Sequence, residues 1–74
     1  MTSDPDREWF VNAIEELARL DERQAAVLRR RFLEGMSVEE TADELEVSPR
    51  SVRTDSRIGY NWLRKKWDDE SKSI

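Results

Sequence analysis

Two closely spaced helix start signals, at Ser37 and Ser48, constrain this chain more than any other feature of its sequence. Glu40 follows Ser37 at the spacing of a capping box, in which two side chains satisfy two backbone amides at a helix N-terminus. Pro49 follows Ser48, and proline suits the first position of a helix because no helical bond to its nitrogen is lost there. The sequence therefore predicts a short helix over residues 38–45, a tight turn, and a second helix that begins at Pro49.

A short helix, a four-residue turn and a second helix are typical of a helix-turn-helix motif. The small Ala42 suits the place where the two helices approach most closely, and Val47 and Val52 are the apolar residues expected to fix their angle. The second helix alternates arginine with polar residues, which is the composition of a helix that meets a polyanion. We therefore predict a helix-turn-helix whose second helix is the recognition helix.

Start and stop signals also divide the rest of the chain. Asp4 and Asp21 are predicted N-terminal caps, Asp21 in a capping box with Gln24, and Gly35 is a predicted C-terminal cap. The acids of residues 68–70 would lie at the negative end of the last helix, so we expect that helix to fray after Trp67. The fold class is a single all-α domain over residues 1–74, ordered over about 5–67, with no strand. Its four helices are predicted over residues 5–20, 22–34, 38–45 and 49–67.

Apolar residues at helical spacing predict which side chains form the core. Leu20 extends the inward-facing stripe of the first helix, whereas Val27 and Leu33 fall at the flanks of the second. The predicted core contains Trp9, Ile14, Leu17, Leu28, Phe32, Ala42, Leu45, Val47, Val52, Trp62 and Leu63. Phe10 and Trp67 are interpreted as core residues as well.

The net charge of −4 is unevenly distributed along the chain. Residues 1–46 hold six arginines against thirteen acids, a net −7, whereas residues 47–67 hold six basic residues against one acid, a net +5. Residues 68–74 contribute −2. Because binding responds to the local field, the basic segment remains a candidate for nucleic-acid binding despite the acidic total.

The predicted second helix of the motif has two distinct faces at about 100° per residue. One holds Arg50, Arg53, Thr54, Arg57, Asn61 and Arg64, and the other holds Val52, Gly59, Trp62, Leu63 and Trp67. Arginine can donate two hydrogen bonds to one guanine, to its O6 and N7 atoms. Threonine can contact a base or a thymine methyl, and serine hydroxyls can contact phosphate. The predicted DNA-contacting residues are Ser48, Arg50, Ser51, Arg53, Thr54, Arg57 and Asn61.

Simpler roles for the same residues remain open. The arginines can form a solvated helix face, and the serines can serve only as caps and surface hydroxyls. Residues 29–31, three arginines in a row, can reach the DNA backbone beside the site or pair with Glu34 and Glu22.

The residue types that the chain lacks exclude several function classes. It has no cysteine and no histidine, which excludes disulfides, thiolate chemistry and an ordinary zinc site. It also has no glycine-rich phosphate loop, so we expect no enzyme activity and no cofactor. No apolar run approaches the length of a membrane span, and we expect a cytoplasmic protein without membrane contact.

Residues 20–67 resemble region 4 of bacterial sigma factors, specifically the extracytoplasmic-function group. Asp55 and the run Trp62-Leu63-Arg64 are similar to one subgroup of that family. The other matched elements are Leu20, Arg23-Gln24, Val27-Leu28, Arg31-Phe32-Leu33-Glu34-Gly35, Ser37, Glu39-Glu40, Ala42, Leu45, Val47-Ser48 and Val52.

The resemblance implies a winged-helix-like DNA-binding domain without strands. It implies that the domain is a monomer that binds the minus-35 promoter element in the major groove and docks on the β flap of RNA polymerase during transcription initiation. An anti-sigma factor is a further implied partner.

The sequence departs from the family pattern at three positions. Glu46 stands where the turn usually has glycine, and a left-handed residue other than glycine there would cost about 1 kcal/mol. Thr41 and Glu44 replace residues that are more often apolar. Nothing resembles region 2, so we expect an excised domain or a free-standing relative.

Two other functions remain open from the sequence. The domain could act by protein contact with polymerase or a sigma or anti-sigma partner, or it could be the output domain of a response regulator. Arg23-Gln24 and the extension over residues 62–67 favour the sigma interpretation, whereas a dimer through the last helix would favour the response regulator.

Overall fold

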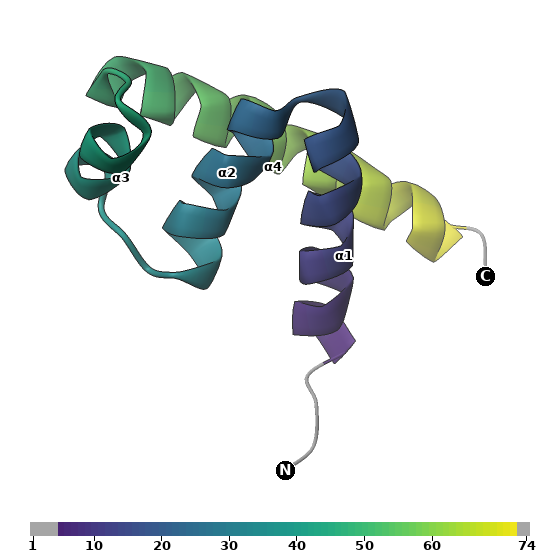
Figure 1. The fold of residues 1–74 in the computed structure, drawn as a ribbon. Coiled ribbons are helices and arrows are strands. Elements are labelled where there is room, and N and C mark those ends of the chain that lie inside the picture. The colour runs from purple at the N-terminus through teal and green to yellow at the C-terminus, as the bar shows by residue number, and fades with distance from the viewer. Residues whose placement is uncertain (1–4, 73–74) are drawn as a thin grey trace, which may run out of the picture.

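The computed structural model of the chain describes residues 5–72, and helices account for almost all of them (Figure 1). No strand occurs within these residues, which confirms the all-α fold class. The predicted cap Asp4 lies outside the described residues. The helices are α1 (Pro5–Leu20), α2 (Glu22–Leu28), the π-helix η1 (Arg29–Leu33), α3 (Val38–Leu45) and α4 (Pro49–Lys72).

The predicted caps Ser37 and Asp21 are both used, but only Ser37 forms the predicted capping box. The Ser37 hydroxyl accepts from the Glu40 amide at 3.0 Å, and the Glu40 carboxylate accepts from the Ser37 amide at 2.9 Å, so the capping box is complete. The Asp21 carboxylate accepts from the Gln24 amide at 3.1 Å and caps α2. These caps fix where α2 and α3 begin.

Two residues have the left-handed backbone conformation that ends a helix. Gly35 has φ of 70° after η1, which confirms it as a C-terminal cap. Glu46 closes α3 with φ of 57° and ψ of 44°, the conformation expected of a position where related turns carry glycine. The motif therefore forms with a conformational strain on the order of 1 kcal/mol at Glu46.

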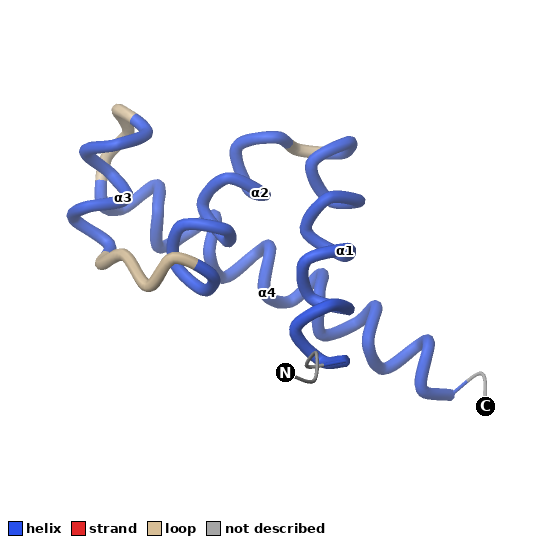
Figure 2. The backbone as a smooth tube through the Cα atoms, turned by 60° about the horizontal axis from the view of Figure 1, so that its bottom comes forward, coloured by secondary structure: helices blue, strands red, loops and turns tan. Residues whose placement is uncertain are grey.

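Helix α2 lies between two groups of buried side chains, as its position between α1 and α3 shows (Figures 1 and 2). Val27, predicted at the flank, has no exposed surface because α2 is covered on two sides. One group joins α1, α2 and α4 through Ala13, Ile14, Leu17, Ala25, Leu28 and Leu63. The other joins α2, α3 and α4 through Val27, Ala42 and Val52, against which Leu45 and Val47 pack as partly buried residues.

The π-helix η1 corrects the prediction for Phe32. A π turn adds a residue to a helical turn, so the inward-facing position after Leu28 moves from Phe32 to Leu33. Leu33 packs against the first core group, and Phe32 is 45% exposed. The bond from the Glu34 amide to the Arg29 carbonyl, at 3.0 Å, has the five-residue span of a π turn.

Contacts with α1 extend α4 to Lys72, so the predicted fraying after Trp67 is wrong. The indole N–H of Trp9 donates to Glu70 at 2.7 Å, and the Trp9 and Trp67 rings meet edge to face at 4.9 Å. Lys66 lies 2.9 Å from both Glu16 and Glu70. The unfavourable charge at the helix end is thus offset by tertiary partners.

The same contacts change the titration of the charged groups. Hydrogen bonds from Lys66 and then from Trp9 lower the pKa of Glu70, and the bonds to Glu16 and Glu70 raise the pKa of Lys66.

Trp67 remains 42% exposed and Leu20 is 70% exposed, so neither is a core residue. Leu20 is the last residue of α1 and lies beyond the buried stripe.

Candidate nucleic-acid interface

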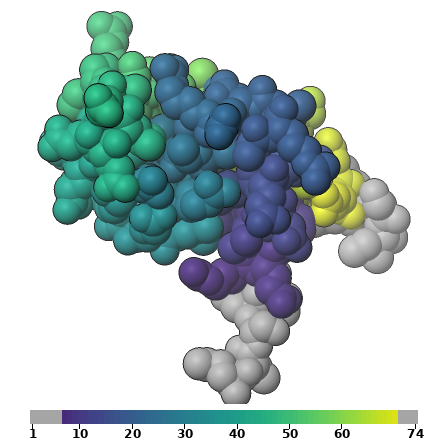
Figure 3. Space-filling model, in the orientation of Figure 1, coloured from purple at the N-terminus to yellow at the C-terminus, as the bar shows by residue number. Residues whose placement is uncertain are grey.

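The predicted DNA-contacting residues gather on the N-terminal half of α4 and its cap. Figure 3 shows α3 and the start of α4 together at one end of the molecule, away from the C-terminal end of α4. Ser51 is half-buried, and the other six are exposed: Ser48, Arg50, Arg53, Thr54, Arg57 and Asn61. The structure therefore brings the predicted residues together on one accessible helical surface.

The burial of Val52 determines which face of α4 is turned outward. Val52 has no exposed surface and packs with Ala42 of α3 and Val27 of α2. Residues 50 and 52 are about 200° apart on a helix, so burying Val52 turns Arg50 away from the protein. The Val47 amide donates to the Ala42 carbonyl at 3.0 Å and ties the turn to α3.

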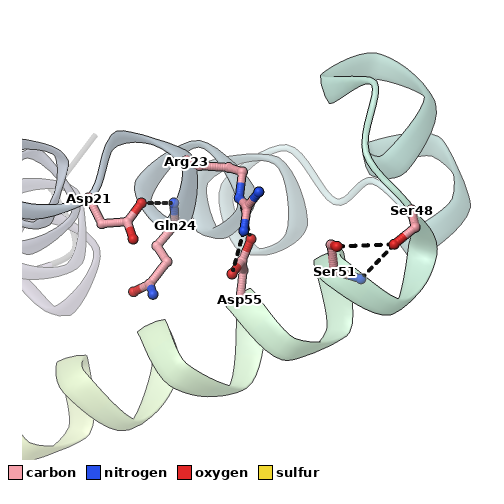
Figure 4. A network of polar contacts seen from close by, with 6 residues as sticks. All are labelled: Asp21, Arg23, Gln24, Ser48, Ser51 and Asp55. Atoms are coloured by element: carbon pink, nitrogen blue, oxygen red, sulfur yellow. Dashed lines mark hydrogen bonds and ion pairs between the residues drawn. The ribbon is translucent and has the colours of Figure 1, made fainter.

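Asp55 is the single acid in the basic segment, and it lies on the inner side of α4. The Arg23 guanidinium donates to its two carboxylate oxygens, from Nε at 2.8 Å and from Nη2 at 3.4 Å (Figure 4). The Asp55 side chain is 7% exposed, compared with 57% for Arg23. This negative charge is therefore paired and kept away from the outer face.

The role of Asp55 could have been found in the sequence. Residues 52, 55 and 59 occupy one stripe of a helix, and Val52 and Gly59 were predicted to face inward. An acid in an inward-facing stripe requires a basic partner, because an unpaired buried charge is costly. The sequence did not identify Arg23 as that partner.

The two serines at the start of α4 hydrogen-bond to each other. The Ser48 hydroxyl accepts from the Ser51 amide at 3.1 Å and donates to the Ser51 hydroxyl at 3.0 Å (Figure 4). These bonds support the capping role that the sequence left open. A helix N-terminus also favours an anion, so the cap and a phosphate contact are compatible at this end of α4.

Arg30 and Arg31, two of the three arginines in the run at residues 29–31, make internal contacts. Arg30 lies 2.9 Å from Glu34 and 3.2 Å from Glu44, and Arg31 donates to the Met36 carbonyl at 2.6 Å. These contacts favour the pairing alternative for the arginine run. Arg53 is also paired, because its Nη2 atom lies 3.6 Å from a carboxylate oxygen of Glu39 on α3.

An exposed row of aromatic side chains lies beside the arginine face. Phe32 of η1 contacts Phe10 of α1, with ring centres 6.2 Å apart, and Tyr60 of α4, with ring centres 6.1 Å apart. A shallow groove of about 270 Å³ next to this row is lined by Trp9, Phe10, Tyr60, Leu63, Arg64, Trp67 and Asp68. The sequence missed this surface because aromatic residues at helical spacing were interpreted as core.

The geometry suits recognition of a polyanion by a helix. Across residues 5–72, no cluster of three or more acidic side chains could hold a metal ion. No helix in that part of the chain is long and apolar enough to cross a membrane. The useful chemistry of the exposed face is the set of guanidinium, hydroxyl and amide donors on α4.

Comparison with known proteins identifies the family. No curated protein and no solved structure matches the chain. The family description "Sigma-70, region 4" matches residues 10–55, which span most of α1, all of α2, η1 and α3, and the first turns of α4. The match covers more than half of the chain, which therefore belongs to the sigma-70 region 4 family of DNA-binding helix-turn-helix domains.

Proposed function

We propose that this domain recognises a minus-35-type promoter element with α4 and docks on RNA polymerase for transcription initiation in the cytoplasm. The observation that carries the proposal is the outward-facing basic surface on the N-terminal half of α4, behind a fully formed helix-turn-helix. The family match supports the same class of function.

The proposed contacts follow from the position of each residue along α4. An α-helix fits the major groove, and the N-terminal turns of a recognition helix reach the base edges. We assign base contacts to Arg50, Arg53 and Thr54, which share one side of those turns. Arg57 and Asn61 lie further along the helix, and we assign them to the DNA backbone.

The charge distribution predicts weak and salt-sensitive binding. The domain has a net charge of −4, so acids elsewhere oppose its approach to DNA although the recognition surface is basic. Each phosphate contact releases counterions, so affinity falls as salt rises. Binding should therefore be measured at low and moderate salt.

The proposal is tested by titrating wild type, Arg53→Ala and Arg57→Ala on a minus-35-like duplex and a scrambled duplex. Arg53→Ala should cost about 1–3 kcal/mol on the preferred duplex and much less on the scrambled one. Arg57→Ala should weaken binding to both duplexes alike. It should also reduce the slope of log affinity against log salt concentration by about one unit. Lys65→Ala removes the same charge outside the proposed contacts and serves as the matched control.

The outcomes separate the functions that the sequence left open. If Arg53→Ala keeps full discrimination between duplexes, Arg53 does not read bases. If folded wild type binds neither duplex near about 50 mM salt, the proposal that this chain recognises DNA is wrong. The alternative function, by contact with another protein, then takes its place.

For polymerase docking, we propose the aromatic row as the apolar part of the surface. Phe32 and Tyr60 are 45% and 50% exposed, and exposed apolar clusters of this kind mark protein contacts. Tyr60→Ala should reduce capture of the domain by the β flap, whereas Arg53→Ala should not. Capture unaffected by Tyr60→Ala, or absent in wild type, would contradict this part of the proposal.

A further inference from the structure

We infer that Glu39 is an internal competitor of DNA for Arg53, and that it lowers the affinity of the recognition helix for DNA. The inference rests on the proposed function, because it concerns one of the proposed base-reading residues. Glu39 is not among the predicted site residues; the structure places its carboxylate beside Arg53.

The contact joins the two helices of the helix-turn-helix. Glu39 belongs to the first turn of α3, and its Oε2 atom lies 3.6 Å from Nη2 of Arg53 on α4. The neighbouring Glu40 forms the capping box with Ser37, so the start of α3 is capped without Glu39. The Glu39 carboxylate is therefore available to the guanidinium of Arg53.

The exposure of both side chains makes the pair accessible to DNA. The Arg53 and Glu39 side chains are 63% and 69% exposed, so no other part of the described chain encloses them. A base or phosphate that binds Arg53 must replace the carboxylate or accept it as a close negative neighbour. Either event opposes binding, by loss of the ion pair or by like-charge repulsion.

The geometry favours a competitor over a brace. A carboxylate that braces an arginine for base reading holds it through short charge-assisted bonds of about 2.7–2.9 Å. The contact between Glu39 and Arg53 is single and, at 3.6 Å, longer than a hydrogen bond. It therefore attracts the guanidinium and restrains it only weakly. A brace would predict the opposite effect on DNA binding when Glu39 is removed.

The expected effect is modest and is largest on the duplex that Arg53 reads. An exposed ion pair of this kind stabilises the free protein only slightly. Its loss should therefore change the affinity for DNA by about two- to fivefold. Glu39→Gln should therefore tighten binding to the minus-35-like duplex by about that factor, and binding to the scrambled duplex by less, because Arg53 contributes less there. Asp43→Asn removes the same charge from an exposed position of α3 and should have a smaller effect, because it reports only the general field.

A cycle with Arg53→Ala separates the pair from the general charge effect. On the Arg53→Ala background, Glu39→Gln should tighten binding no more than Asp43→Asn does. Side-chain ¹⁵N relaxation of Arg53 Nε in the free protein supplies a readout without DNA. Glu39→Gln should increase the motion of that side chain, and Asp43→Asn should leave it unchanged.

The outcomes distinguish this inference from the proposed function. If wild type binds DNA and Glu39→Gln matches Asp43→Asn, the inference is overturned and the proposed function stands. If Glu39→Gln weakens binding to the minus-35-like duplex alone, Glu39 is a brace or a base contact. If folded wild type does not bind DNA, both are overturned.

Discussion

Arg23 of α2 holds Asp55 of α4 through two donors on one guanidinium, at 2.8 and 3.4 Å. Asp55 is 5% exposed, so this pair fixes a buried carboxylate on the inner face of the recognition helix. The pair thereby connects the helix that carries the proposed DNA contacts to the helix at the centre of the fold.

Breaking this pair should destabilise the domain. Arg23→Ala leaves the buried Asp55 carboxylate without its guanidinium, and because Arg23 is 57% exposed, water screens part of the loss. We expect the free energy of unfolding to fall by about 1–2 kcal/mol in a urea titration. Arg19→Ala changes another exposed arginine and is the control; equal effects of the two variants would show that the pair contributes nothing.

Thr41 predicts a stabilising substitution. Its side chain has no exposed surface, and its hydroxyl oxygen has no hydrogen-bond partner among residues 5–72. A buried hydroxyl without a partner lowers stability, and valine has nearly the same shape. Thr41→Val should raise the free energy of unfolding by about 1 kcal/mol.

Thr54→Val is the matched control, since Thr54 is exposed on the next helix and should respond weakly. Loss of stability in Thr41→Val would mean that the hydroxyl is satisfied in solution. This position is one where the sequence departs from the apolar residues of the family. We therefore expect this departure to cost the domain stability.

Gly59 allows α4 to approach α2 closely. A Cβ atom at position 59 would lie 2.8 Å from Cδ1 of Leu28, a residue with no exposed surface. Alanine favours a helix by about 1 kcal/mol over glycine, but overpacking a core costs about 1–3 kcal/mol. Gly59→Ala should therefore destabilise the domain in thermal or urea unfolding.

A second substitution tests the cause of that loss. Leu28→Val removes the terminal carbons that the new Cβ atom would meet. The double variant should therefore lose less stability than the sum of the losses in the Gly59→Ala and Leu28→Val single variants. A Gly59→Ala variant more stable than wild type would show that Leu28 moves aside without cost.

Local signals in the sequence were sufficient to predict where the helices begin. Serine, aspartate, proline and glycine at the caps act within one turn, so the starts of α2, α3 and α4 follow from a few adjacent residues. The face of α4 that carries the arginines also followed from periodicity alone. Its contacts with DNA stay a prediction.

Features that depend on distant residues could not be predicted in the same way. The π turn places Leu33 against the core in place of Phe32, because it changes the helical period at that point. A prediction that assumes one fixed helical spacing cannot include such a change. The end of α4 depends on Trp9, sixty-one residues before Glu70. The aromatic row and the Arg23–Asp55 pair likewise need the packing of α1, α2 and α4.

The most direct test of DNA recognition by α4 is an NMR titration of the 74-residue chain with a minus-35-like duplex at low salt. Backbone amide shifts should change over residues 48–61 and in the arginine side chains of that segment, because we propose that this part of α4 enters the major groove. Residues of α1 and the end of α4, including Trp9 and Trp67, should change little. Shift changes confined to α1 and the aromatic row, or none near about 50 mM salt, would contradict recognition through α4.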